Sequence, residues 1–164
     1  MKLRILSMVL VALTLAACNR GTVGVQGNGD GTATVTVTVT QAEVNAAIAD
    51  ALNVSNPLLR NPSVDLQPGQ IVISGEHDRR DGGGRVSGSV TMTLTVQDGA
   101  LLAQIVSANI EGLDMSDARI AEFNQRMIER MTNRAGRDNR VVTMQSVTIT
   151  DSDVQIVFTA GRGQ

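Results

Sequence analysis

The chain has 164 residues, of which 42% are hydrophobic and 18% are charged, and its formal net charge at pH 7 is −2. Beyond residue 17 every basic residue is an arginine, twelve against sixteen acidic residues, so this part carries a formal charge of −4. The chain has no Trp, no Tyr and only two Phe. Nucleic-acid binding is therefore disfavoured, because it needs surplus positive charge and, for single strands, aromatic platforms. The length suits one domain with one aliphatic core.

The first 17 residues are typical of a secretory signal peptide. A short basic segment, residues 1–4, precedes an apolar run over residues 5–17 that is too short for a permanent membrane span. The stretch Leu15-Ala16-Ala17-Cys18 resembles the lipobox of bacterial lipoproteins, in which the cysteine thiol receives a diacylglyceryl group. We therefore predict a lipid on Cys18 and an extracytoplasmic place in the cell envelope, at the outer membrane or the outer face of the cytoplasmic membrane. The alternative is an ordinary signal peptide followed by an unrelated cysteine.

Residues 18–31 are interpreted as a flexible tether. Gly, Asn, Thr and Gln dominate this segment, and Val23 and Val25 are too sparse to predict a strand. The thirteen residues after Cys18, 19–31, span roughly 20 Å on average and about 45 Å when fully extended. We therefore expect the domain, residues 32–160, to sit near the membrane or to swing clear of it, with residues 161–164 as a tail.

The domain is expected to begin with a strand followed by a helix. Residues 32–40 alternate threonine with alanine or valine, which is the period-two pattern of a half-buried strand. Thr40-Gln41-Ala42-Glu43 is a capping box, in which the side chains of the first and last residues bond each other's backbone amides. The helix that starts there is predicted to run until residues 53–57 stop it. Its apolar stripe consists of Val44, Ala47, Ile48, Ala51 and Leu52.

Four strands are predicted over residues 63–67, 70–78, 85–97 and 100–110. The short links between them predict antiparallel hairpins. One face of the third strand is apolar and the other carries serine and threonine. The fourth strand has apolar residues on both faces, so it is either covered on both sides or exposes apolar surface.

A second, longer helix is predicted from Asp117, with Ser116 as its cap, to about Ala135, with Gly136 placed to end it. A final hairpin follows, over residues 140–150 and 154–160. The apolar face of this helix consists of Ile120, Phe123, Met127, Ile128, Met131 and Ala135.

The order of these elements is strand, helix, four-strand meander, long amphipathic helix and hairpin. With the lipobox and the stretch Thr40-x-x-Glu43-Val44-Asn45-x-x-Ile48, this order resembles small bacterial envelope proteins of the YceB, YpmS and LmeA kind, which are similar to single TULIP-type modules. Over residues 32–160 the resemblance implies an α+β fold. In this fold a curved antiparallel β-sheet of about seven strands packs around two helices, the longer one C-terminal, with an apolar groove suited to lipid chains. The rival fold is a cystatin-like roll with one helix across an open sheet.

Two sets of residues are candidates for a ligand site. If a groove exists, the apolar stripes of the two helices should line it, because a curved sheet would enclose them. These residues are Val44, Ile48, Phe123, Met127 and Met131. Beside this stripe four arginines recur at intervals of four, four and three residues and form a basic edge suited to lipid phosphates. These are Arg126, Arg130, Arg134 and Arg137. The alternatives are that the methionines are core residues and that the arginines are a solvated face, with Glu122 paired to Arg126.

We expect no catalytic residues, no metal site and no cofactor. His77, the one histidine, is interpreted as part of a solvated strand end, since its neighbours Glu76 and Asp78 point to the opposite face of a strand. The chain therefore offers no pattern for an enzyme, and we expect that it is not one. Binding of a lipid or another amphiphile is the favoured function. The alternative is a non-catalytic structural or assembly lipoprotein that docks another envelope protein, and in both cases the membrane is a partner through Cys18.

Overall fold

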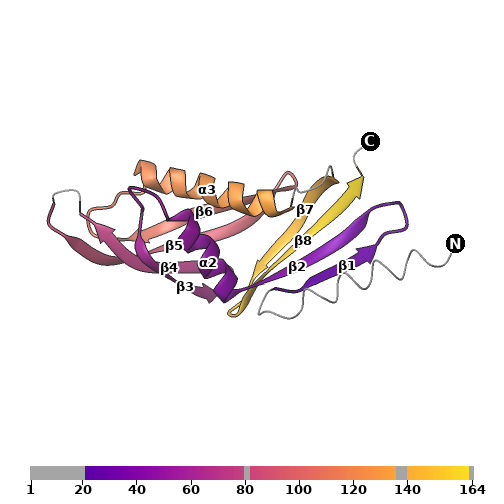
Figure 1. Ribbon diagram of the computed structural model, residues 1–164, viewed down its shortest axis with the longest axis horizontal. Coiled ribbons are helices and arrows are strands. Elements are labelled where there is room, and N and C mark those ends of the chain that lie inside the picture. Colours follow the sequence, from indigo (N-terminus) through magenta and orange to yellow (C-terminus); the bar gives the residue numbers. More distant parts are fainter. Residues whose placement is uncertain (1–20, 80–81, 136–139, 163–164) are drawn as a thin grey trace.

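The computed structural model describes residues 21–79, 82–135 and 140–162, and the side chains of residues 130–135, 140, 141 and 162 lie outside this description. The fold is α+β, with two helices and eight antiparallel strands (Figure 1). In chain order the elements are β1 (Val23–Gly27), β2 (Ala33–Thr40), α2 (Gln41–Ala51), β3 (Arg60–Gln67), β4 (Gln70–Asp78), β5 (Arg85–Gln97), β6 (Ala100–Asn109), α3 (Ala118–Ala135), β7 (Arg140–Ile149) and β8 (Asp153–Arg162).

The strands form two four-stranded sheets, with the orders β1-β2-β8-β7 and β3-β4-β5-β6. The prediction of one sheet with about seven strands is therefore wrong in both respects. The meander forms a sheet of its own because each of its strands pairs only with its neighbours in the sequence. The second sheet is non-local, since β2 pairs with β8 along its whole length.

Most predicted elements are confirmed. The bounds of β4 and β5 match the predicted strands at both ends. Helix α2 begins at the predicted capping box, where the Thr40 hydroxyl accepts from the Glu43 amide and the Glu43 carboxylate accepts from the Thr40 amide. Strand β3 starts earlier than predicted, at Arg60, and is irregular between Arg60 and Ser63. The strand therefore includes Pro62, a residue type that strands accept only at edges and irregularities.

The prediction of a flexible tether is wrong for Val23–Gly27, which form strand β1. This strand pairs antiparallel with β2, in a register that places Val23 opposite Val37 and Val25 opposite Val35. Only five residues long, β1 carries little pattern of its own, and its order comes from hydrogen bonds to β2. The hairpin of β1 and β2 extends beyond the two helices (Figure 1).

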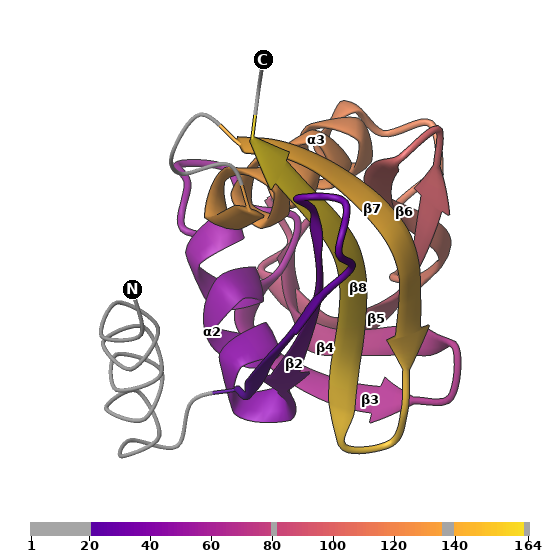
Figure 2. The same ribbon diagram turned by 90° about the vertical axis from the view of Figure 1, so that its right-hand side faces the viewer.

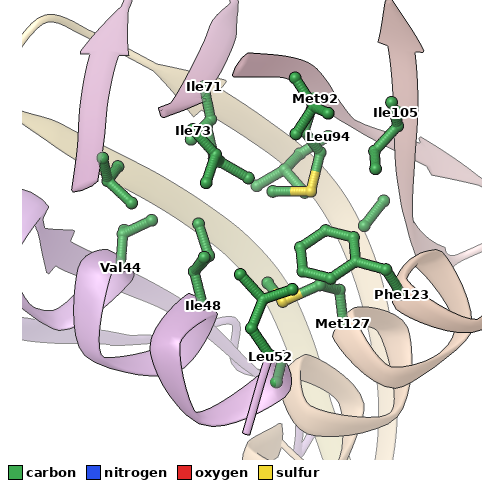
Figure 3. Packing of buried hydrophobic residues seen from close by; sticks show 14 of the residues in the cluster. Val44, Ile48, Leu52, Ile71, Ile73, Met92, Leu94, Ile105, Phe123 and Met127 are labelled. Carbon is green, nitrogen blue, oxygen red and sulfur yellow. The ribbon is translucent and has the colours of Figure 1, made fainter. Parts of the chain in front are cut away.

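The core lies between the helices and the strands. Side chains of α2 and α3 point towards β4, β5 and β6 (Figure 3). The two sheets are joined at β7, where the Gly69 amide donates to the carbonyl oxygen of Ile149 at 3.0 Å and the Met144 amide donates to that of Gly99 at 2.9 Å. Figure 2 shows β7 and β8 running across the strands of the other sheet. The tips of the β3–β4 and β5–β6 hairpins thus end against β7.

Strand β6 has two different faces. Leu101, Ala103 and Ile105 are buried in the core, whereas Val106 on the opposite face is 48% exposed. Of the two outcomes expected for this strand, the structure therefore has exposed apolar surface.

Candidate functional site

The predicted groove residues that the structure describes come together, but they do so inside the core. Val44 and Ile48 of α2 face Phe123 and Met127 of α3 (Figure 3), and each of the four is at most 2% exposed. They pack with buried side chains of three strands, among them Ile73, Met92 and Ile105. Enclosed to this degree, the four side chains form packed core, which was the alternative interpretation of the methionines. The side chain of Met131 lies outside the described residues.

Only the first residue of the predicted arginine edge has a described side chain. The Nη1 atom of Arg126 lies 3.5 Å from the Glu122 carboxylate, so this predicted pair is confirmed. The Nε and Nη2 atoms of Arg126 are enclosed and have no hydrogen-bond partner among the described residues. The side chains of Arg130 and Arg134, and the whole of Arg137, lie outside the described residues.

His77 is buried, with 2% of its surface exposed, so the prediction of a solvated strand end is wrong. Its Nδ1 atom lies 2.9 Å from the carbonyl oxygen of Leu58, and its Nε2 atom lies 3.5 Å from Nη2 of Arg119. Arg119 is buried too and forms two hydrogen bonds to the buried Asp117 carboxylate, at 2.9 and 3.1 Å. The hydrogen bond that Arg119 donates to Asp117 raises the pKa of the Arg119 guanidinium, against the opposing effect of burial. The guanidinium is therefore charged at any ordinary pH.

The sequence carried a signal for this burial. His77 shares a strand face with Ile71 and Ile73, which are fully buried, and Arg119 shares a helix face with Phe123 and Met127 at four-residue spacing. Periodicity alone thus places both polar side chains towards the core. The contacts of these two side chains connect three parts of the fold. The His77 imidazole links β4 to Leu58 in the loop before β3, and its contact with the Arg119 guanidinium links β4 to the start of α3. Within the described residues no group of three His, Cys, Asp or Glu side chains could hold a metal ion.

A pocket of about 540 Å³ lies between the end of α2 and the start of β3, and nothing in the sequence pattern pointed to it. Its lining is largely polar and includes Asn53, Arg60 and Arg85. Both arginines bind the Asp78 carboxylate, Arg60 at 2.6 Å and Arg85 at 3.0 Å. The hydrogen bond from Arg60 is the main cause of the lowered pKa of Asp78, with a smaller contribution from Arg85. Arg85 also pairs with the Glu76 carboxylate at 3.3 Å, so both arginine charges at this pocket are balanced by carboxylates.

The chain is held in place from Gly21 onward. The Gly21 amide donates to the Glu43 carboxylate at 2.8 Å, and the Thr38 amide donates to the carbonyl oxygen of Thr22 at 2.8 Å. The same Glu43 oxygen completes the capping box of α2 by accepting from the Thr40 amide at 3.0 Å. A Cβ atom on residue 21 would lie 1.8 Å from the carbonyl oxygen of Thr38, so this approach requires glycine. Glu43 thus joins the start of the domain to the start of its first helix.

Helix side chains cover the edges of the β3–β6 sheet. At β3 the Val64 amide donates to Asn45 at 3.1 Å, and Gln41 donates to the Val64 carbonyl oxygen at 3.1 Å. At β6 the Ile105 amide donates to Asn124 of α3 at 3.0 Å. In the other sheet, β7 is covered by the hairpin tips at Gly69 and Gly99. Three of the four sheet edges are therefore bonded, at some of their backbone groups, by other parts of the described chain.

Strand β1 is the fourth edge, and it differs from the other three. Its sequence, Val-Gly-Val-Gln-Gly, has no charge and no proline. Val23 is 60% exposed and Val25 is 69% exposed. No described residue bonds its outer side. Uncovered edge strands of this kind readily pair with another strand, and soluble proteins usually guard them with charge, proline or a bulge.

Comparison with known proteins identifies no relative of this chain. No protein-family model matches the chain, and no match was found among the curated proteins or the solved structures. The resemblance to TULIP-type modules thus stays a prediction. In the described part of the chain, no helix combines the length and the apolarity that crossing a membrane requires.

Proposed function

We propose that this chain is a non-catalytic docking lipoprotein of the cell envelope, anchored through a lipid on Cys18, which binds another polypeptide through the open edge of β1. The location rests on the signal peptide and the lipobox, either at the outer membrane or at the outer face of the cytoplasmic membrane. The docking role was the alternative at the level of the sequence, and two features of the fold favour it over amphiphile binding.

The observation that carries the proposal is the contrast between β1 and the other three edges. Each of the others has some of its backbone groups bonded by Gln41 and Asn45, by Asn124, or by the hairpin tips. An edge strand with free backbone groups and exposed valines is the surface used in β-augmentation, where a partner adds a strand to the sheet. Main-chain hydrogen bonds then provide affinity, and side-chain contacts provide specificity.

The second feature is the short connection to the predicted lipid. Only Asn19 and Arg20 separate Cys18 from Gly21, where hydrogen bonds to the domain begin. Three peptide units span about 10 Å at most, instead of the 45 Å of a long tether. A lipid on Cys18 would therefore hold the domain close to the headgroups and keep β1 in one orientation to the membrane.

Amphiphile binding is the second candidate, as the TULIP-type resemblance implies through a curved sheet that encloses an apolar groove. The four described residues expected to line the groove are buried, so this candidate needs another surface. One observation favours it, namely that Val35 and Val37 of β2 and Ile156 and Phe158 of β8 share a sheet face and are only partly buried. A lipid chain lying on this face would also contact Val23 and Val25.

The lipid anchor and the docking role are tested separately. Cells given a radioactive fatty acid should label the wild-type protein and not a Cys18→Ser variant, and equal labelling of both would contradict the anchor. For docking, a photo-crosslinking residue is placed at Val25 and, as a control, at Val106, which is also an exposed valine but lies on the other sheet. We expect a protein adduct at position 25 only. Adducts at neither position, together with copurified phospholipid in native mass spectrometry, would favour the amphiphile-binding candidate instead.

A further inference from the structure

The contacts between β1 and β2 determine which backbone groups of β1 are open. The Thr38 amide donates to the carbonyl oxygen of Thr22, and the Asn28 amide donates to that of Thr32. In an antiparallel ladder the backbone groups of alternate residues point to the same side. Positions 22, 24, 26 and 28 therefore face β2. The amide and carbonyl groups of Val23, Val25 and Gly27 point to the outer edge.

We propose that the strand added to this edge is β1 of a second copy of the chain. An antiparallel pair centred on Val25 places Val25 opposite Val25 of the second copy and Val23 opposite Gly27 of the second copy. This register uses every outward-pointing residue of β1 in a hydrogen-bonded pair. Each such pair exchanges two hydrogen bonds. The edge is thus complementary to itself under a two-fold axis, which is the symmetry of most homodimers.

The side chains agree with this register. Val23 and Val25 lie on the same face as Val37 and Val35, and Val35 is in turn opposite Phe158. A two-fold axis perpendicular to the sheet keeps this face on one side in both copies. The apolar row would then run without interruption through the join, and the threonines of β2 would stay on the other face. With no charge on β1, nothing repels the second copy, whereas like charges placed opposite each other would destabilise the pair.

The length of the edge indicates where the pair forms. A five-residue strand is far smaller than the roughly 20–30 residues that each partner contributes to a standard interface. Pairing therefore depends on confinement of both copies to one membrane, which raises their effective concentration. In this respect the inference rests on the proposed function. It deepens that proposal by naming the partner.

Cysteine crosslinking in membranes tests the register. In a hydrogen-bonded antiparallel pair the opposed Cα atoms are about 5.5 Å apart, which suits a disulfide. Val25→Cys should therefore give covalent dimer on mild oxidation of the full-length protein in its native membrane. Val23→Cys is the matched control, because the two copies of residue 23 would be about 13 Å apart along the strands. We expect about tenfold more dimer from Val25→Cys. Both variants retain Cys18, whose sulfur is blocked by the proposed lipid, and any fraction without the lipid affects both variants equally.

Each outcome is decisive. Equal amounts of dimer from the two variants, or none from either, would overturn the self-pairing. An adduct of Val25→Cys heavier than twice the chain would overturn it in favour of a different protein and leave the proposed docking function intact. Covalent dimer from Val25→Cys in a protein that takes up no fatty-acid label would contradict the anchor and leave the self-pairing intact.

A proline variant keeps the inference testable without cysteine chemistry. Val25→Pro removes an amide that points outward, so the pairing of β1 with β2 should persist, as prolines are accepted on the open side of edge strands. The dimer is measured by fluorescence energy transfer between labelled copies in vesicles. We expect the transfer of the wild type to be lost in Val25→Pro and retained in Val25→Ala, which keeps the outward-pointing amide. Unchanged transfer in Val25→Pro would overturn the inference.

Discussion

Strands β7 and β1 are the two edges of one sheet, and the protein treats them in opposite ways. The edge of β7 is closed by the Gly69 amide, which donates to Ile149, and by the Gly99 carbonyl oxygen, which accepts from Met144. The outer edge of β1 is bonded by none of the residues that the structure describes, carries no charge and is flanked by exposed valines. Both edges lie on one apolar row, since Val25 is opposite Val35, Val35 opposite Phe158 and Phe158 opposite Met144. The protein therefore closes one edge of this sheet and leaves the other without a described partner, which calls for a functional explanation.

Alanine substitutions at the two ends of this row should differ most in their effect on the free energy of unfolding. Met144→Ala at the closed edge should destabilise the fold by about 2–5 kcal/mol, because it removes a buried side chain and leaves a cavity. Val25→Ala at the open edge should change the free energy of unfolding by less than about 0.5 kcal/mol, since the valine is exposed. Urea unfolding of the two variants checks this. Equal losses would mean that β1 is as enclosed as β7.

The closure of β7 can be weakened at the hairpin tips. Gly69 and Gly99 both have positive φ, at 80° and 74°, so alanine strains the backbone at either position. At Gly99 the added Cβ atom would also lie 2.9 Å from Cγ2 of Thr143, whereas at Gly69 it would meet nothing within 4 Å. We expect losses of about 1 kcal/mol for Gly69→Ala and about 2 kcal/mol for Gly99→Ala. A smaller loss at Gly99 than at Gly69 in thermal unfolding would contradict the contact with β7.

The start of the domain should respond to glycine substitution at one position and not at another. Gly21→Ala should cost about 1 kcal/mol, because the new Cβ atom displaces the backbone that bonds Glu43 and Thr38. Gly27→Ala is the control, since its Cβ atom would meet nothing within 4 Å. Amide exchange should become faster over residues 21–24 in Gly21→Ala only. Unchanged exchange there would show that the connection to Cys18 is not held as described.

The smallest expected effect on stability is at Asp78, at the end of β4, which binds Arg60 at the start of β3. The pKa of Asp78 is lowered from 3.8, mainly by its hydrogen bond from Arg60, so the bound carboxylate stabilises the fold above the ordinary pKa. This contribution is lost as the pH falls below about 3.8 through the lowered pKa of the folded state. Asp78→Asn should therefore reduce stability at neutral pH and flatten its decline in acid. Parallel pH profiles of wild type and variant would contradict the role of this ion pair.

Elements that depend on interactions between nearby residues were predicted correctly from the sequence, and those that depend on distant residues were not. The capping box at Thr40 and Glu43 and the bounds of β4 and β5 depend on residues close together in the chain, and they are confirmed. Strand β1 was missed because its order depends on β2, and the division into two sheets was missed because it depends on the pairing of β2 with β8. Long-range pairing leaves little trace in a local pattern.

The candidate site shows the same limit. The helix stripes containing Ile48 and Phe123 were identified by periodicity, but periodicity does not distinguish a groove from a filled core. The open edge could not be predicted at all. It is defined by contrast with edges that Asn45 and Asn124 cover, and which strand lies beside a helix is known only from the fold.

The most direct test of the open edge is amide hydrogen exchange in β1. We expect the Gly24 and Gln26 amides, which face β2, to be protected from hydrogen exchange whether the protein is diluted in detergent or concentrated in vesicles. The Val25 and Gly27 amides should exchange freely in dilute detergent and become protected at high density in vesicles, when a second copy occupies the edge. If the Val25 and Gly27 amides exchange freely under both conditions, no second copy pairs with the outer edge of β1 and the proposed dimer is contradicted.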